Sequence, residues 1–177
     1  MYYRSIQYGR SMIEMLGVLA VIGVISIGGL SVIAKAKRES DISKVMENVA
    51  HLIMLSKRMA CQYEVAYGSY TMMIYKSEIY PPALNYDKTV NAFVDSTNHQ
   101  YTIADSSYNA TFTVAVNNIS SEACIKFATT DWGTRQSNGF SKVCIDNNCV
   151  TSFTIDEASA KCTDNSTLKL IYNACKQ

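Results

Sequence analysis

The chain has 177 residues, a length that suggests about one domain, and 48% of them are hydrophobic while only 18% are charged. Lys and Arg number 16 and Asp and Glu number 15, so the net charge is +1 and no basic excess exists to neutralise a phosphate backbone. Nucleic acid is therefore not an expected partner. Two histidines leave few options for acid–base or zinc chemistry, and six cysteines in so short a chain indicate an oxidising compartment.

The first marked feature is an uncharged run from Met15 to Ala34, MLGVLAVIGVISIGGLSVIA. As a helix this run would be about 30 Å long, which matches one hydrocarbon thickness. Exposing this many Val, Ile and Leu side chains to water would cost a large amount of free energy. The run therefore predicts burial in a bilayer or inside a protein core. A cleavable signal peptide that ends at Ala34-Lys35-Ala36 and a plain membrane anchor are two interpretations of it.

A third interpretation starts from the string GRSMIE, Gly9 to Glu14, directly before the run. A carboxylate at the edge of an apolar segment needs a reason, because charge is costly there. The string resembles the class III signal of type IV pilins and pseudopilins, in which cleavage follows a Gly and Glu is the fifth residue of the mature chain. The resemblance implies a leader over residues 1–9, cleavage by a prepilin peptidase between Gly9 and Arg10, and N-methylation of Arg10.

The same resemblance implies assembly as the function. The precursor would be a single-pass protein of the inner membrane, and a pilus assembly platform with its ATPase machinery would draw it into an extracellular helical homopolymer. Glu14 would pair with the N-terminal amine of a neighbouring subunit, with the Arg10 guanidinium as a second partner, and would set the axial register. Close approach of neighbouring helices would be permitted by Gly17, Gly23, Gly28 and Gly29.

Two other classes of protein stay open. One is a minor pilin or a pseudopilin of type II secretion, because the N-terminal signal fits these equally well. The other is a membrane-anchored periplasmic binding module that never polymerises. An enzyme is not expected, since the chain has no Gly-x-Ser-x-Gly motif, no P-loop and no His-Glu-x-x-His. No cofactor is expected either.

Beyond the apolar run the chain keeps a helical pattern. No Pro occurs before Pro81, and no Gly occurs between Gly29 and Gly68. We expect one helix from about Met12 to about Cys61, apolar all round in its first half and amphipathic in its second. The apolar stripe of the second half comprises Ile42, Val45, Met46, Val49, Leu52, Ile53, Met59 and Ala60. The predicted organisation is thus a leader (1–9), a long helix (10–61) with a membrane part (15–34), and a globular head (62–177).

The head mixes helical and strand patterns, which indicates an α+β fold. The long helix is expected to cover one face of an antiparallel sheet. Ser120 is a candidate N-cap for a helix that runs from Ser121 to about Asp131. The remaining expected elements are a short helix at 72–79, strands at 101–104 and 110–117, a hairpin of 142–145 and 149–154, a helical turn at 156–162 and a last strand at 167–172.

Sequence alone does not choose among the pairings of six cysteines. The distal run ISSEACIKFATTDWG to KLIY resembles the end of type IVb pilins, and that resemblance implies a Cys124–Cys162 bridge. If Asp146-Asn147 is a two-residue turn, Cys144 faces Cys149 in a non-hydrogen-bonded pair, which suits a disulfide. These two bridges would leave Cys61 and Cys175 as the third pair. An alternative set of pairings has Cys162–Cys175, which would close a local loop near the C-terminus. A zinc site is not expected, because the last four cysteines form no Cys-x-x-Cys pair.

Overall fold

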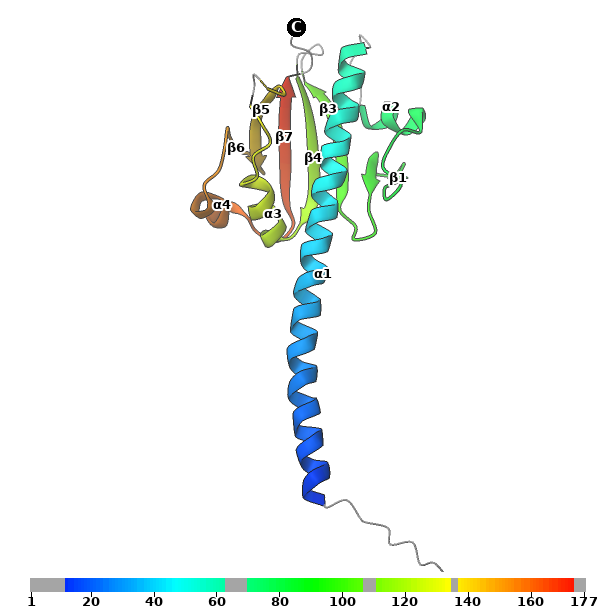
Figure 1. Ribbon diagram of the computed structural model, residues 1–177. Coiled ribbons are helices and arrows are strands. Elements are labelled where there is room, and N and C mark those ends of the chain that lie inside the picture. The colour runs from blue at the N-terminus through cyan, green and yellow to red at the C-terminus, as the bar shows by residue number, and fades with distance from the viewer. Residues whose placement is uncertain (1–11, 63–69, 107–110, 135–136, 174–177) are drawn as a thin grey trace, which may run out of the picture. The chain divides into compact units, whose positions relative to one another are not determined.

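The computed structural model describes residues 12–62, 70–106, 111–134 and 137–173, and along the first helix it describes side chains from Ser31 onward (Figure 1). The chain divides into two units, Met1–Ser43 and Lys44–Gln177. In the first unit the described residues are all helical. The second unit holds the end of that helix together with every other helix and strand, and we call it the head.

The long helix predicted from the sequence is confirmed as α1 (Met12–Gln62). The amphipathic stripe is also confirmed within the head, where Val45, Val49 and Leu52 are buried while Glu47 is exposed. Spacings of three and four residues place these apolar side chains on one face of the helix. The second half of α1 therefore contributes one wall of the hydrophobic core.

A single antiparallel sheet forms the centre of the head. Its seven strands follow the order β1-β2-β3-β4-β7-β5-β6, and every neighbouring pair is antiparallel. The strands are β1 (Asn85–Asp87), β2 (Ala92–Val94), β3 (Gln100–Ser106), β4 (Thr111–Ile119), β5 (Phe140–Ile145), β6 (Asn148–Val150) and β7 (Ser166–Asn173). β7 thus inserts between β4 and β5, and β1 and β6 are the two edges.

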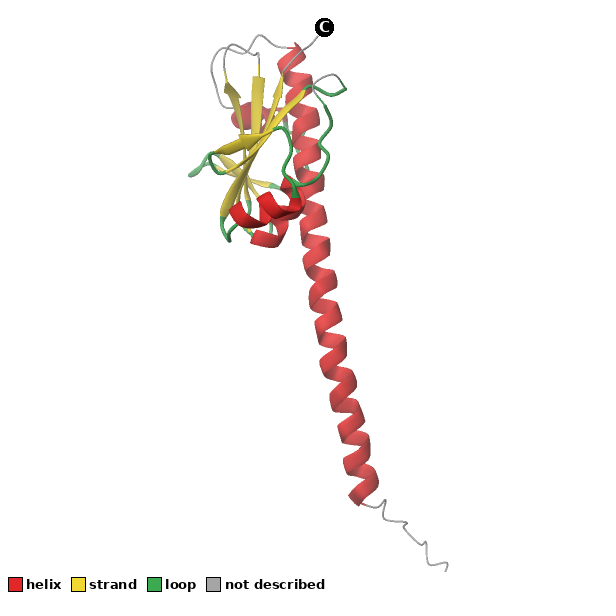
Figure 2. Ribbon diagram, turned by 90° about the vertical axis from the view of Figure 1, so that its left-hand side faces the viewer, coloured by secondary structure: helices red, strands yellow, loops and turns green. Residues whose placement is uncertain are grey.

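One face of this sheet is covered by helices. Figures 1 and 2 show α1 running along that face and α3 (Ser121–Ala128) lying over the same face nearer β5 and β7. Along β7 the burial alternates: Leu168 and Leu170 are fully buried, whereas Lys169 and Ile171 are partly exposed. This two-residue period is that of a sheet with one covered face and one face open to solvent. The α+β prediction is therefore confirmed.

Some element boundaries differ from those expected. α2 spans Tyr70–Ser77 and α4 spans Ile155–Lys161, each within two residues of its predicted start. β6 ends at Val150, earlier than the predicted strand, and the sequence did not predict β1 and β2, which have three residues each. α3 ends at Ala128 instead of Asp131, with Thr129 as its C-cap; the Thr129 hydroxyl donates to the Ile125 carbonyl over 2.8 Å.

The membrane location predicted from the sequence is wrong. Among the residues that the structure describes, no helix combines the length and the apolar character that crossing a bilayer requires. The described side chains of α1 begin at Ser31, and Lys35 and Lys37 follow within two turns. This finding overturns the predicted location as a single-pass inner-membrane precursor.

Candidate functional site

The residues predicted for processing and assembly lie at the start of the chain. Gly9 and Arg10 lie outside the described residues. Glu14 lies in the backbone of α1, in the part whose side chains are not described, as do the four predicted packing glycines, Gly17, Gly23, Gly28 and Gly29. The geometry that bears on function is therefore that of the head.

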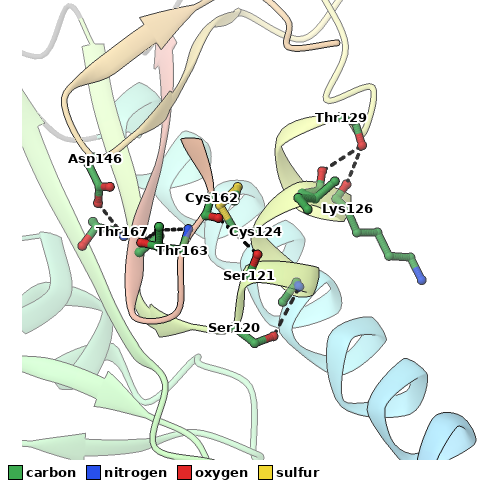
Figure 3. Close-up of a disulfide and its surroundings, with 12 residues drawn as sticks. Ser120, Ser121, Cys124, Lys126, Thr129, Asp146, Cys162, Thr163 and Thr167 are labelled. Atoms are coloured by element: carbon green, nitrogen blue, oxygen red, sulfur yellow. Dashed lines mark hydrogen bonds between the residues drawn. A yellow bond between two sulfur atoms is a disulfide. The ribbon is translucent and has the colours of Figure 1, made fainter. Parts of the chain in front are cut away.

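A disulfide ties the two short helices of the distal head together. Cys124 of α3 is bonded to Cys162, the C-cap of α4, with their Cα atoms 5.7 Å apart (Figure 3). Both cysteines are buried, at 0% and 6% exposure. This is the pair that the resemblance to type IVb pilins implies, and it leaves no place for a competing Cys162–Cys175 bridge. The bridge closes a long stretch of chain that contains the whole β5–β6 hairpin.

Hydrogen bonds around this bridge fix the start of α3. The predicted N-cap is confirmed: the Ser120 hydroxyl accepts from the Ala123 amide over 3.3 Å (Figure 3). The Ser121 hydroxyl donates to the Cys162 carbonyl over 3.1 Å, and the Ser121 amide donates to the Asp164 carboxylate over 2.9 Å. These contacts satisfy amides that a helix start leaves unpaired. The disulfide and the caps therefore form one connected joint between α3 and the chain that leads into β7.

The β5–β6 hairpin has the register predicted from its turn. Ile145 pairs with Asn148 and Cys144 pairs with Cys149, so Asp146 and Asn147 form the two-residue connection. Asp146 adopts a φ of +52°, a left-handed value that Asp tolerates in turns. Cys144 and Cys149 form a disulfide, with Cα atoms 4.0 Å apart. The bridge joins the buried strand β5 to the exposed edge strand β6.

The hairpin is also anchored to β7 through its turn. The Asp146 amide donates to the Thr167 carbonyl over 2.8 Å, and the Asp146 carboxylate accepts from the Thr167 amide over 2.9 Å (Figure 3). Beyond the hairpin, α4 starts at a capping box in which Thr154 and Glu157 bond each other's backbone amides. Hydrogen bonding to the Thr154 backbone and hydroxyl lowers the pKa of Glu157. The third predicted bridge, Cys61–Cys175, involves Cys175, which lies outside the described residues.

The sequence did not point to a partly buried polar cluster in the β2–β3 connection. The Asp95 carboxylate accepts five hydrogen bonds. Oδ1 accepts from the Thr97 amide (2.9 Å), the Thr97 hydroxyl (2.7 Å) and the His99 amide (3.0 Å). Oδ2 accepts from the Tyr101 hydroxyl (2.7 Å) and from His99 Nδ1 (2.9 Å). The spacing Asp-x-Thr-x-His in a turn was the available signal, since Asp side chains commonly cap the amides two residues on.

Burial and hydrogen bonding perturb the groups in this cluster. Burial alone disfavours the charged form of Asp95, but the donors from His99, Tyr101 and Thr97 outweigh it and hold the pKa of this carboxyl far below its usual range. Burial, and then the bond to Asp95, raises the pKa of the Tyr101 hydroxyl well above its ordinary value. Burial likewise raises the pKa of Tyr172. Asp95 is therefore ionised and Tyr101 is neutral across the physiological range.

Tyrosines gather at the other edge of the sheet, near β1 and β2. The Tyr75 and Tyr86 rings stack with centroids 4.1 Å apart, and Tyr80 lies 5.0 Å from the Phe93 ring. Phe93 itself is fully buried, so these amphipathic rings cover a small apolar core between α2 and the β1–β2 hairpin. This arrangement agrees with packing as the role of the tyrosines.

The described part of the chain contains no group of three His, Cys, Asp or Glu side chains that could hold a metal ion. Contacts between residues distant in the sequence are found around α3 and the β5–β6 turn: the Cys124–Cys162 disulfide, the bonds of Ser121 to Cys162 and Asp164, and the bonds between Asp146 and Thr167.

Comparison with known families gives one match. The family model described as PilS N terminal matches residues 39–174. The matched region covers the amphipathic part of α1 and the whole described head. Comparisons with curated proteins and with solved structures give no significant match.

Proposed function

Because the chain belongs to the PilS N-terminal family, a type IV pilin-related family, we propose that it is a structural subunit of a type IV pilus filament. The match over residues 39–174 carries this proposal, because it spans about three-quarters of the chain and includes the head. Family membership by itself shows that the protein is pilus-related; its role as a filament subunit is the proposal.

The shape of the elements supports a subunit that polymerises through its N-terminal helix. α1 begins at Met12, well before the matched region, and remains helical through the Gly28-Gly29 pair. A helix of this length with a head on its second half can pack side by side with copies of itself. Such a contact is heterologous and does not close on itself, so it generates a helical filament.

The two disulfides of the head suit a protein that is exposed to mechanical force and to proteases. The Cys124–Cys162 and Cys144–Cys149 bridges secure the part of the head where edge strand β6 and helix α4 are most exposed. A disulfide keeps a segment folded chiefly by restricting the unfolded chain. These features serve a subunit that must stay folded in a filament.

Processing and register form the next part of the proposal. A prepilin peptidase cleaves after Gly9 and methylates the amine of Arg10, and an assembly platform with its ATPase adds the subunit to the filament. Glu14 then pairs with the N-terminal amine of a neighbouring subunit. A carboxylate buried among apolar helices is costly unless it is paired, so this pair selects one axial register.

Filament yield of Glu14→Ala tests the proposal. Host cells that express the variant are sheared, and filaments are counted by electron microscopy while cleavage is followed by the mass of the subunit. We expect normal cleavage and loss of filaments. Glu47→Ala is the matched control, because Glu47 is an exposed carboxylate of the same helix, and it should assemble normally.

Two outcomes would contradict the proposal. If Glu14→Ala cells made filaments in normal number, the proposed pairing of Glu14 with the N-terminal amine would be refuted. If the wild-type chain were absent from every filament, the proposed structural role would be refuted. A chain present only at trace stoichiometry would instead identify a minor pilin or a pseudopilin.

A further inference from the structure

The two disulfides in the described part of the head differ in their access to solvent. Cys124 and Cys162 are 0% and 6% exposed, so both ends of that bridge are buried. Cys144 is 1% exposed, but its partner Cys149 is an exposed residue of edge strand β6. Thiol–disulfide exchange begins when a thiolate reaches one sulfur of a bridge. The hairpin bridge therefore offers an external thiol one open side, at Cys149.

The strand register places lysines near the buried end of this bridge. Cys144 of β5 pairs with Lys169 of β7, and residues paired across an antiparallel ladder share one face of the sheet. This is the open face, because the next pair, Val143 and Leu170, is buried on the helix-covered face. Lys142 lies two positions before Cys144 on β5, so it is on the same open face, where it is exposed. A nearby cation stabilises a thiolate, so these lysines favour Cys144 as the leaving sulfur.

The two strands of the hairpin are held to the head unequally. All three residues of β6 (148–150) are exposed, and the strand pairs only with β5 in the sheet (Figure 1). On β5, Val143 and Ile145 are buried, and the strand also pairs with β7. The Asp146 amide and carboxylate at the end of β5 both bond Thr167. β6 therefore depends on the bridge for its position, whereas β5 does not.

We propose that the Cys144–Cys149 bridge is a thiol–disulfide exchange site, at which an external dithiol attacks Cys149 and releases β6 from β5 while the rest of the head stays folded. This site is a property of the head and does not depend on the proposed polymerisation. β5 would then become the outer strand on this side of the sheet, with its backbone open to a new partner strand.

The exchange takes place in two steps. One thiolate of the dithiol bonds to the Cys149 sulfur, the bond between the two cysteines breaks, and the Cys144 sulfur leaves with the electron pair and takes up a proton. The second thiolate of the dithiol then attacks the first sulfur of the same molecule, and the Cys149 sulfur leaves and takes up a proton. The dithiol is oxidised to a disulfide by two electrons, and these reduce the bridge to two thiols.

Limited reduction of the full-length oxidised protein tests the site. The folded protein is treated with dithiothreitol, samples are quenched with N-ethylmaleimide at intervals, and the labelled cysteines are identified by peptide mass mapping. We expect Cys144 and Cys149 to be labelled at least about tenfold faster than Cys124 and Cys162, because the buried bridge reacts only after local unfolding. Equal rates, or faster labelling of Cys124 and Cys162, would overturn the proposal.

Lys169→Gln tests the part played by charge. Lys88→Gln is the matched control, because Lys88 is an exposed lysine in the β1–β2 connection at the opposite edge of the sheet. We expect Lys169→Gln to slow the labelling of Cys144 and Cys149 about threefold or more, and Lys88→Gln to leave it unchanged. Loosening of the sheet would speed the reaction instead, so a slower rate reports on charge. The same rate in both variants would refute the role of Lys169.

NMR spectra of the variant Cys144→Ala with Cys149→Ala test the release of β6. This variant removes the bridge without a reductant. We expect the amide resonances of residues 148–150 to move to the positions of an unfolded chain, and those of Leu168 and Leu170 in β7 to keep their folded positions. Folded positions for residues 148–150 would refute the release, and loss of the folded positions in β7 would refute its confinement to the edge.

Discussion

Removing the two disulfides of the head separately should cost unequal amounts of stability. Cys124 and Cys162 are 38 positions apart, whereas Cys144 and Cys149 are 5 apart. In the loop-entropy treatment the stabilisation grows with the logarithm of the closed length, which gives about 4 kcal/mol for the first bridge and about 2 kcal/mol for the second. This difference of about 2 kcal/mol comes from the closed chain length, because each bridge restricts the unfolded chain.

Urea unfolding of two paired variants measures this difference. Cys124→Ala with Cys162→Ala removes the long bridge, and Cys144→Ala with Cys149→Ala removes the short one. Each is followed by circular dichroism without reductant, and we expect the first pair to lose about 2 kcal/mol more free energy of unfolding than the second. Because Cys124 and Cys162 are both buried, lost packing adds to the first effect.

Equal losses, or a larger loss for the hairpin bridge, would refute this reasoning. Such a result would mean that the Cys124–Cys162 joint is already held in the unfolded chain, or that the caps at Ser120 and Ser121 hold it without the bridge.

Three smaller predictions follow from single contacts. Thr71→Val keeps the shape of a buried side chain but removes its bonds to the amide and carbonyl of Ile103 (2.8 and 3.1 Å), so urea unfolding should show a loss of about 1–3 kcal/mol. Thr154→Ala removes the capping box of α4, so an NMR titration should find the pKa of Glu157 raised back towards its ordinary value. The fold should weaken below about pH 4, because the pKa of Asp95 is lower in the folded chain than in the unfolded chain. The stability that Asp95 contributes is complete above the ordinary aspartate range and is lost as the pH falls towards the folded pKa. Urea midpoints measured at about pH 6 and about pH 3 would show this loss.

Local patterns were enough to predict the parts of the fold that depend on near neighbours. The stripe of Val45, Val49 and Leu52 marks the buried face of α1, and the lack of Pro before Pro81 and of Gly between Gly29 and Gly68 predicted that the helix continues to about Cys61. The Asp146-Asn147 turn sets the β5–β6 register, because a two-residue connection pairs the strands in only one way. Ser120 identified the start of α3 by its capping chemistry.

Features that depend on distant residues escaped prediction. The Thr71 hydroxyl bonds the amide and the carbonyl of Ile103, which is 32 positions away, and no local pattern places these two residues together. β2 was missed because its three residues form a strand only by pairing with β1 and β3. The predicted membrane location failed for another reason: it rested on the apolar run taken by itself, while no described helix is long and apolar enough to cross a bilayer.

The intact mass of the protein in sheared filaments, measured with and without reductant, tests the central claim most directly. The account predicts that the principal filament subunit begins at N-methylated Arg10 and that reductant adds the mass of the hydrogens expected for opened disulfides, including Cys124–Cys162 and Cys144–Cys149. A chain that still begins at Met1, or filaments whose principal subunit is a different protein, would contradict it.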